Sequence, residues 1–164
     1  MKQTTAALRL RKATGEDGPF LLAVRNADDV RSQSKTQHVI SEETHRDWLQ
    51  KHLNSSDTVI WIIERGGERL GYVRAQKIDD GHEKGDWLLS IALQRSARGQ
   101  GYASWALLKT CRLMRKDVGA GSLVAEVFTT NAAAQRLFKN AGFVDKATTR
   151  EGQSSIVRFE IPLG

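Results

Sequence analysis

The stretch Asp86-Trp-Leu-Leu-Ser-Ile-Ala-Leu93, followed closely by Arg98-Gly-Gln-Gly-Tyr-Ala103, decides the fold of this chain. It predicts an apolar strand that leads into a glycine-containing turn and then into a helix. The first turn of a helix offers unpaired backbone N–H groups and the positive end of the helix dipole, which suit an anion such as phosphate. Gly99 and Gly101 let the backbone come close to that anion. Taken alone, such a turn is more typical of a simple chain reversal.

The composition is that of a globular protein. The chain has 164 residues, of which 40% are hydrophobic and 27% charged, and we expect one domain spanning 1–164 with a substantial core. We find no apolar segment long enough to cross a membrane and no signal peptide. The single cysteine, Cys111, cannot form an internal disulfide. A cytoplasmic protein with no membrane partner is therefore expected.

The net charge of +6 favours an anionic ligand, for which nucleic acid and a phosphorylated cofactor are the candidates. The positive charges are scattered, and the sequence has neither an aromatic RNA-stacking motif nor a zinc-finger spacing. We therefore expect no nucleic-acid partner. The four histidines have no cysteine or carboxylate at a recognised ligand spacing, so no metal site is predicted. They are His38, His45, His52 and His82.

The residues before the opening stretch predict three strands and two helices. Alternating and β-branched residues indicate the strands. These strands are expected over 8–12, 58–63 and 69–75. Helix-start signals at Thr14 and Ser41 indicate the two helices. The polar segment 27–39 between them is expected to be irregular and to be the place for a mobile flap.

The residues after the glycine turn predict a crossover between parallel strands. The expected elements are a helix over 102–115, a strand over 122–129, a helix over 131–140, a strand from 143 and a last strand over 155–161. A strand, a helix and a second strand in this order make a right-handed crossover, whereas the hairpins before and after it are antiparallel. The sequence therefore predicts an α/β fold with a mixed sheet.

Two motifs resemble those of the GCN5-related N-acetyltransferase (GNAT) family. Arg98, Gly101 and Ala103 match the family signature Gln/Arg-x-x-Gly-x-Gly/Ala, directly after the expected strand. The stretch 126–143 matches a second signature, in which a strand is followed by Asn131, an alanine-bearing helix and Gly-Phe. The resemblance covers nearly the whole chain. It implies the mixed α+β GNAT fold, a mostly antiparallel sheet of about seven strands flanked by about four helices.

The resemblance implies that acetyl-CoA binds as the acetyl donor, without a metal. Backbone N–H groups over 98–104 would bind the pyrophosphate, and the edge of the strand 87–93 would pair with the pantetheine. A bulge in that strand would separate it from the next parallel strand. Asn131 is expected to contact the cofactor, to cap its helix, or to do both. The expected cofactor-binding residues are Ile91, Leu93, Arg98, Gly99, Gln100, Gly101, Tyr102, Ala103, Ser104, Asn131 and Phe138.

The same resemblance suggests Glu126 as the catalytic base that deprotonates the amine. A solvent-facing or salt-bridged strand residue is the alternative. Phe138 occupies the position of a tyrosine that is proposed in the family to protonate the departing thiolate. A thiol with a pKa of about 8.5 leaves without such a donor, and Tyr72 or Tyr102 would replace it only if the fold brings the hydroxyl to the sulfur. A non-catalytic acetyl-CoA-binding module is thus the rival interpretation.

The N-terminal helices resemble those of the branch that acts on nucleotide-linked amino sugars in pseudaminic acid synthesis. The expected substrate-binding residues are Arg25, Asn26, Arg31, His45 and Trp48. The arginines would meet a diphosphate, the histidine a hydroxyl or phosphate, and the tryptophan a sugar or base. Solvated arginines, a structural histidine and a core tryptophan are the ordinary alternatives. We expect N-acetylation of this small-molecule amine, with a protein N-terminus or a ribosomal protein as alternative acceptors, and a homodimer is compatible with the family.

Overall fold

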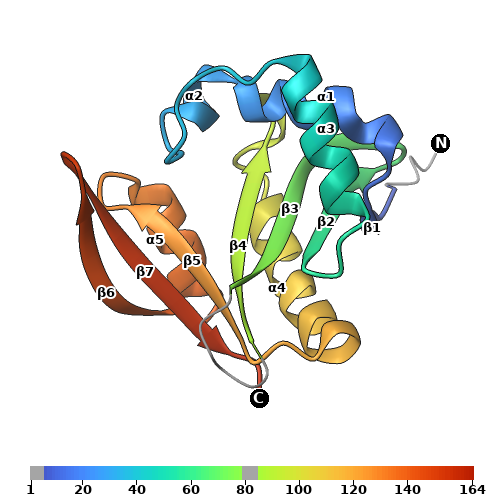
Figure 1. Ribbon diagram of the computed structural model, residues 1–164. Helices are drawn as coiled ribbons and strands as arrows, with labels where there is room; N and C mark the ends of the chain where they lie inside the picture. Colours follow the sequence, from blue (N-terminus) through green and yellow to red (C-terminus); the bar gives the residue numbers. More distant parts are fainter. Residues whose placement is uncertain (1–5, 79–84) are drawn as a thin grey trace.

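The computed structural model describes residues 6–78 and 85–164, which form one seven-stranded mixed sheet with helices on both faces (Figure 1). The strand order is β1-β2-β3-β4-β5-β7-β6, and β4–β5 is the parallel pair among antiparallel neighbours. The strands are β1 (Leu8–Lys12), β2 (Thr58–Arg65), β3 (Glu68–Ile78), β4 (Asp86–Leu93), β5 (Ser122–Phe128), β6 (Val144–Glu151) and β7 (Ser154–Pro162). The predicted α/β class and mixed sheet are confirmed.

Within residues 6–78 and 85–164, five α-helices accompany the sheet: α1 (Gly18–Asn26), α2 (Asp28–Arg31), α3 (Glu42–Leu53), α4 (Tyr102–Leu113) and α5 (Ala132–Asn140). Alternate residues of a strand point to opposite faces, so the sheet has two cores. On one face, Ile60 and Ile62 of β2 pack with Leu21 of α1 and Leu49 of α3. On the other face, residues of the sheet form a larger apolar cluster with residues of α4 and α5, among them Leu107 of α4.

Two helical segments differ from the expectation. The segment 27–39 is not wholly irregular, because its first residues form the single turn α2, in which the N–H of Arg31 donates to the carbonyl of Ala27 (2.9 Å). The helix expected over 102–115 ends at Leu113 and continues as a π-helical turn, η3 (Met114–Val118). These short turns depend on local contacts, which sequence periodicity does not indicate. Short 3₁₀ turns, η1 (Gly15–Asp17) and η2 (Arg95–Ala97), precede α1 and follow β4.

The parallel strands β4 and β5 pair over three residues and then separate. Their register runs from Asp86↔Ser122 to Leu88↔Val124, and Figure 1 shows the two strands diverging from that end. The bulge expected in β4 is absent, since its register with β3 is unbroken over the whole strand. The strands diverge because β4 stays paired with β3 and β5 stays paired with β7. At the far end of β4, Gly71 allows a close approach of β3, since a Cβ there would lie 2.3 Å from the carbonyl oxygen of Ala92.

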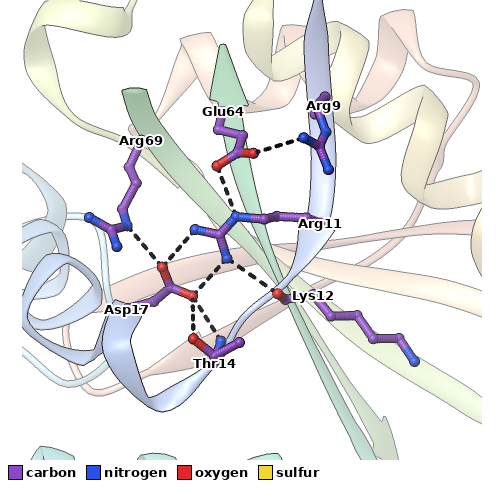
Figure 2. Close-up of polar contacts among 7 residues, drawn as sticks. All are labelled: Arg9, Arg11, Lys12, Thr14, Asp17, Glu64 and Arg69. Carbon is purple, nitrogen blue, oxygen red and sulfur yellow. Dashed lines mark hydrogen bonds and ion pairs between the residues drawn. The ribbon is translucent and has the colours of Figure 1, made fainter. Parts of the chain in front are cut away.

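A buried carboxylate ties the N-terminal segment to the sheet (Figure 2). The side chain of Asp17 is 1% exposed and accepts hydrogen bonds from Arg11 (2.8 and 2.9 Å), Arg69 (2.8 Å) and the backbone N–H of Thr14 (2.8 Å). Arg11 also donates to Glu64 of β2 (2.8 Å). These bonds, those of Arg11 first, hold the pKa of Asp17 well below its usual range although burial acts in the opposite direction.

Replacing this carboxylate is expected to destabilise the fold. Asp17→Asn removes the negative charge that Arg11 and Arg69 share and is expected to lower the free energy of unfolding by about 2–3 kcal/mol. Because the folded-state pKa is depressed, the wild-type stabilisation is complete above the unfolded-state pKa and is lost as the pH falls below about 4. Urea unfolding at several pH values measures both effects.

The control is Asp47→Asn, at an exposed position of α3, which is expected to change the stability by less than about 0.5 kcal/mol. Equal stability of the Asp17→Asn variant and the wild type at neutral pH would contradict the assignment.

Candidate functional site

A cleft of about 860 Å³ opens where β4 and β5 separate. One wall is formed by 88–93 of β4 and the other by 125–128 of β5. The N-terminus of α4 and the side of α5 complete it, and α2 with the loop after it lies over the open end (Figure 1). Of the expected cofactor residues, those that line the cleft are Ile91, Leu93, Arg98, Gly99, Gly101, Tyr102, Ala103, Ser104, Asn131 and Phe138.

The glycine turn forms an anion cradle at one end of the cleft. Gly99 and Gly101 have φ of 75° and 81°, a backbone conformation that residues with a Cβ rarely adopt. Gly101 is the N-cap of α4, and the first hydrogen bond of that helix runs from the N–H of Trp105 to the carbonyl of Gly101 (3.1 Å). The three preceding N–H groups, in 102–104, therefore remain available to an anion.

The polar side chains of this turn form hydrogen bonds and ion pairs with other residues of the protein. Arg98 donates to the carbonyl of Leu93 (3.0 Å) and pairs with Asp29 of α2, so it links the turn to β4 and to the segment above the cleft. Gln100, one of the expected cofactor residues, does not line the cleft; it donates to the carbonyl of Ser96 (3.2 Å). The hydroxyl of Tyr102 donates to Gln100 (3.0 Å) and accepts from Arg65 of β2 (2.9 Å).

Glu126, for which the sequence left a catalytic and a salt-bridged position open, lines the cleft and is also salt-bridged. It lines the β5 wall of the cleft with a side chain that is 25% exposed, and it forms an ion pair with Lys35 (2.5 Å) from the loop after α2. Lys35 also contacts Glu151 of β6 (3.1 Å). Burial lowers the pKa of Lys35, but the bonds and charges of the two glutamates outweigh it and the net shift is upward. The loop is thus held across the cleft by charge.

The helix α5 supplies an amide and an aromatic ring to the cleft. Asn131 is its N-cap, and its side-chain oxygen accepts from the N–H of Ala134 (3.1 Å). Phe138 is 4% exposed and packs edge-on against Phe143, with ring centroids 5.1 Å apart. An aromatic core residue without a hydroxyl therefore lines the cleft at this position. Tyr72 of β3 is the tyrosine with an uncommitted hydroxyl among the described residues of the cleft.

A second cavity of about 470 Å³ lies between α1, α3 and β3, next to the cleft. Four residues line both: Arg25, Thr36, Tyr72 and Arg74. The predicted substrate residues His45 and Trp48 line the second cavity, and their rings stack with centroids 5.6 Å apart. Burial lowers the pKa of His45, which favours the neutral ring. Arg74 lies on the same strand face as Tyr72 and lines both cavities, and it was not among the residues predicted from the sequence.

Asn26 and Arg31 are not brought to either cavity. The side chain of Asn26 donates to the carbonyl of Ile40 (2.8 Å) and accepts from its N–H (2.9 Å). Arg31 donates to the carbonyls of Asn26 (3.0 Å) and Gln37 (2.9 Å). Both side chains hold the ends of the loop above the cleft together. We therefore leave them out of the acceptor site proposed below.

Residues 6–78 and 85–164 show neither a metal-ligand group nor a membrane-spanning helix, and His82 lies outside these described ranges. In these ranges no three His, Cys, Asp or Glu side chains are grouped as metal ligands. No helix of the described residues is long and apolar enough to cross a membrane. Cys111 is partly buried against the larger core, and burial raises the pKa of its thiol, as expected of a packing residue.

Solved structures share this architecture. The spermidine N-acetyltransferase from Vibrio cholerae, in complex with CoA and spermine, superposes with a TM-score of 0.85 at 18% identity over 95% of both chains. The ribosomal-protein-alanine N-acetyltransferase from Brucella melitensis gives 0.80 at 22% identity, over 94% of this chain and 99% of that one. At these identities the likeness concerns the fold.

A curated relative and a family model match the sequence itself. N-acetyltransferase 8B from Mus musculus is 30% identical over 99 residues, which are 59% of this chain and 42% of that protein. The chain thus spans less than half the length of this relative. The model of the acetyltransferase (GNAT) domain matches residues 7–144, from β1 to the start of β6. The chain belongs to the GNAT acetyltransferase family.

Proposed function

We propose that the protein transfers an acetyl group from acetyl-CoA to a primary amine. The observation that carries the proposal is the juxtaposition in one cleft of an unpaired strand edge, a helix N-terminus and the carboxylate of Glu126. The family membership supports the same reaction. A module that binds acetyl-CoA without turnover is the competing function, because Phe138 replaces the tyrosine that commonly serves as the acid.

The described residues fit the cofactor. The N–H groups of 102–104 and the positive end of α4 suit a pyrophosphate. Beyond Leu88, the edge of β4 that faces β5 has no strand partner, so its peptide groups can pair with the amides of an extended arm. Asn131 caps α5 with its side-chain oxygen and can direct its amide N–H₂ toward the same arm.

Acetyl-CoA supplies the acetyl group as a thioester, and attack by the amine in a ternary complex forms the C–N bond, breaks the C–S bond and releases the CoA thiol. The amine must first lose a proton, and Glu126 accepts it directly or through a water. The nitrogen loses its second proton as the amide forms, and water passes that proton to the leaving thiolate, which needs little assistance at a pKa of about 8.5. Tyr102 is a poor candidate for this acid, since its hydroxyl is held by Arg65 and Gln100.

Lys35 sets the condition under which Glu126 acts. In the absence of an acceptor, the ammonium group of Lys35 forms an ion pair with the carboxylate of Glu126. An acceptor ammonium has the same charge and hydrogen-bond donors, so it can take the place of Lys35, which retains Glu151 as a partner. Binding of the acceptor thereby frees the loop from β5.

A nucleotide-linked amino sugar is our first choice of acceptor. Arg25 suits a phosphate, while His45 and Trp48 give the second cavity surfaces for a sugar or base. A ribosomal protein, the acceptor in the name of the Brucella melitensis structure, is the second choice. The loop held across the cleft by Lys35 favours the smaller acceptor. The assay is release of CoA thiol from acetyl-CoA with a panel of nucleotide-linked amino sugars, phosphorylated amines, amino acids, peptides and spermidine.

The anion cradle is tested by Gly101→Ala. Alanine is strained at φ +81°, so the variant is expected to distort the cradle and to raise the Kd of CoA about tenfold. Gly119→Ala is the matched control, since Gly119 also has a positive φ (71°) and no atom near its added Cβ, but it lies outside the cleft. Calorimetric titration with CoA measures both. An equal loss of affinity in the two variants would contradict the cradle.

The base is tested by Glu126→Gln. This variant is expected to lower kcat by about 10²–10³-fold while changing the Kd of acetyl-CoA less than about twofold. Glu151→Gln is the control, because it also removes a partner of Lys35 but lies outside the cleft.

The pH dependence of kcat is expected to differ between Glu126→Gln and the wild type, because the variant has no carboxylate to accept the proton of the amine. An unchanged profile would remove Glu126 as the base, and no thiol release with any amine, despite binding of acetyl-CoA, would establish the binding module instead.

A further inference from the structure

We propose that Arg25 and Arg74 form a binding site for an anionic group of the acceptor, a phosphate or a carboxylate. The proposal rests on the acetyltransferase function for the ligand being an acceptor. Arg25 comes from the last turn of α1 and Arg74 from β3, and both line the cleft as well as the second cavity. The two arginines therefore lie at the junction of the cleft and the second cavity, among the residues that the two spaces share.

Neither arginine has a carboxylate partner among residues 6–78 and 85–164. In the same ranges, seven other arginines form ion pairs with aspartate or glutamate: Arg9, Arg11, Arg31, Arg46, Arg69, Arg95 and Arg98. Arg25 donates through Nη2 to the carbonyl of Thr36 (2.8 Å), whereas its Nη1 is buried without a hydrogen-bond partner. The guanidinium of Arg74 lies 5.4 Å from the ring centroid of Trp48.

The electrostatics of the junction favour an anion. Burial lowers the pKa of Arg74, and the charge of Arg25 acts in the same direction. Two like charges in a partly dry cavity repel, and an anion between them removes that repulsion while accepting from the free N–H groups. Burial raises the pKa of Tyr72, so its phenol keeps its proton and adds a donor on the same strand face.

The distribution of charge also fixes the orientation of the acceptor. The carboxylate of Glu126 lies in the cleft, whereas the residues that line the second cavity include two arginines and no aspartate or glutamate. An acceptor whose amine lies at Glu126 can extend toward the two arginines, because both line the cleft as well as the second cavity. An acceptor whose anionic group contacts the two arginines is bound both at its amine and at its anionic group. A polyamine would bring a second cation against Arg25 and Arg74, so it is a poor acceptor.

Anion binding is tested on the full chain saturated with CoA, which occupies the cradle at α4. Inorganic phosphate and acetate are titrated separately, and the tighter of the two identifies the kind of anion. Arg74→Gln and Arg25→Gln are each expected to weaken that binding at least about tenfold. Arg46→Gln removes the same charge from the exposed surface of α3 and is expected to leave it unchanged.

Arg74→Gln is expected to unfold at or above the wild-type temperature without ligand, because it relieves the repulsion. Arg74→Lys keeps the charge but loses the planar fork, so intermediate binding is expected. Unchanged binding of both anions in Arg74→Gln, or no binding to the wild type, would overturn the proposal.

Turnover gives a second and separate readout. Matched acceptors differ in one anionic group: glucosamine 6-phosphate against glucosamine, and glycine against glycinamide. Arg74→Gln is expected to raise KM for the anionic member of the preferred pair about 10–100-fold and for its neutral partner less than about threefold. Equal effects on both members, or wild-type preference for spermidine, would contradict the site.

The proposed reaction and the proposed anion site are contradicted by different results. If no amine is acetylated but Arg74→Gln abolishes anion binding, the anion site stands and the reaction fails. If amines are acetylated and Arg74→Gln changes neither binding nor KM, the reaction stands and the anion site fails.

Discussion

The site depends on where the parallel pairing between β4 and β5 stops. Three residue pairs join these parallel strands, and beyond Leu88↔Val124 each keeps only its outer neighbour. The continuous ladders on the outer sides keep both strands extended, so their separation leaves a wedge with peptide groups along its edges. An isolated open edge would invite association, but here it faces into the cleft and suits an extended ligand. The wedge also sets where α4 begins and where the carboxylate of Glu126 lies.

The segment above the wedge is connected to both of its walls by charged side chains. On the β4 side, Asp29 of α2 pairs with Arg98, which also donates to the carbonyl at the end of that strand. On the β5 side, Lys35 pairs with Glu126. Between these contacts, Arg25 holds the loop through the carbonyl of Thr36. A ligand that changes the partner of Lys35 or Arg25 therefore acts on the loop itself. Exposed ion pairs are weak, so such an exchange has a small free-energy cost.

The sequence predicted the parts of the fold that depend on local chemistry. The strand, the glycine turn and the helix around Gly101 followed from apolar patterning and from the backbone freedom of glycine, and Asn131 followed from capping chemistry. Features that depend on distant contacts did not follow. The separation of β4 from β5 arises without the expected bulge, through pairing with strands elsewhere in the chain. Arg74 resembles any solvent-facing strand residue until α1 and α3 cover that face. Periodicity specifies a face but not what lies against it.

The carboxylate in the cleft and the two arginines at the junction have a common consequence for specificity. Glu126 is satisfied by Lys35 when no acceptor is present, so the amine end of an acceptor replaces an existing bond and gains little net affinity. The buried Nη1 of Arg25 has no such partner, so an anion there forms bonds that the free protein lacks. In the proposed site, affinity for the acceptor would therefore come mainly from its anionic end, and reactivity from its amine. Such a division lets a cleft that is common to many acetyltransferase folds select its substrate at the side of the cleft away from the reacting atoms.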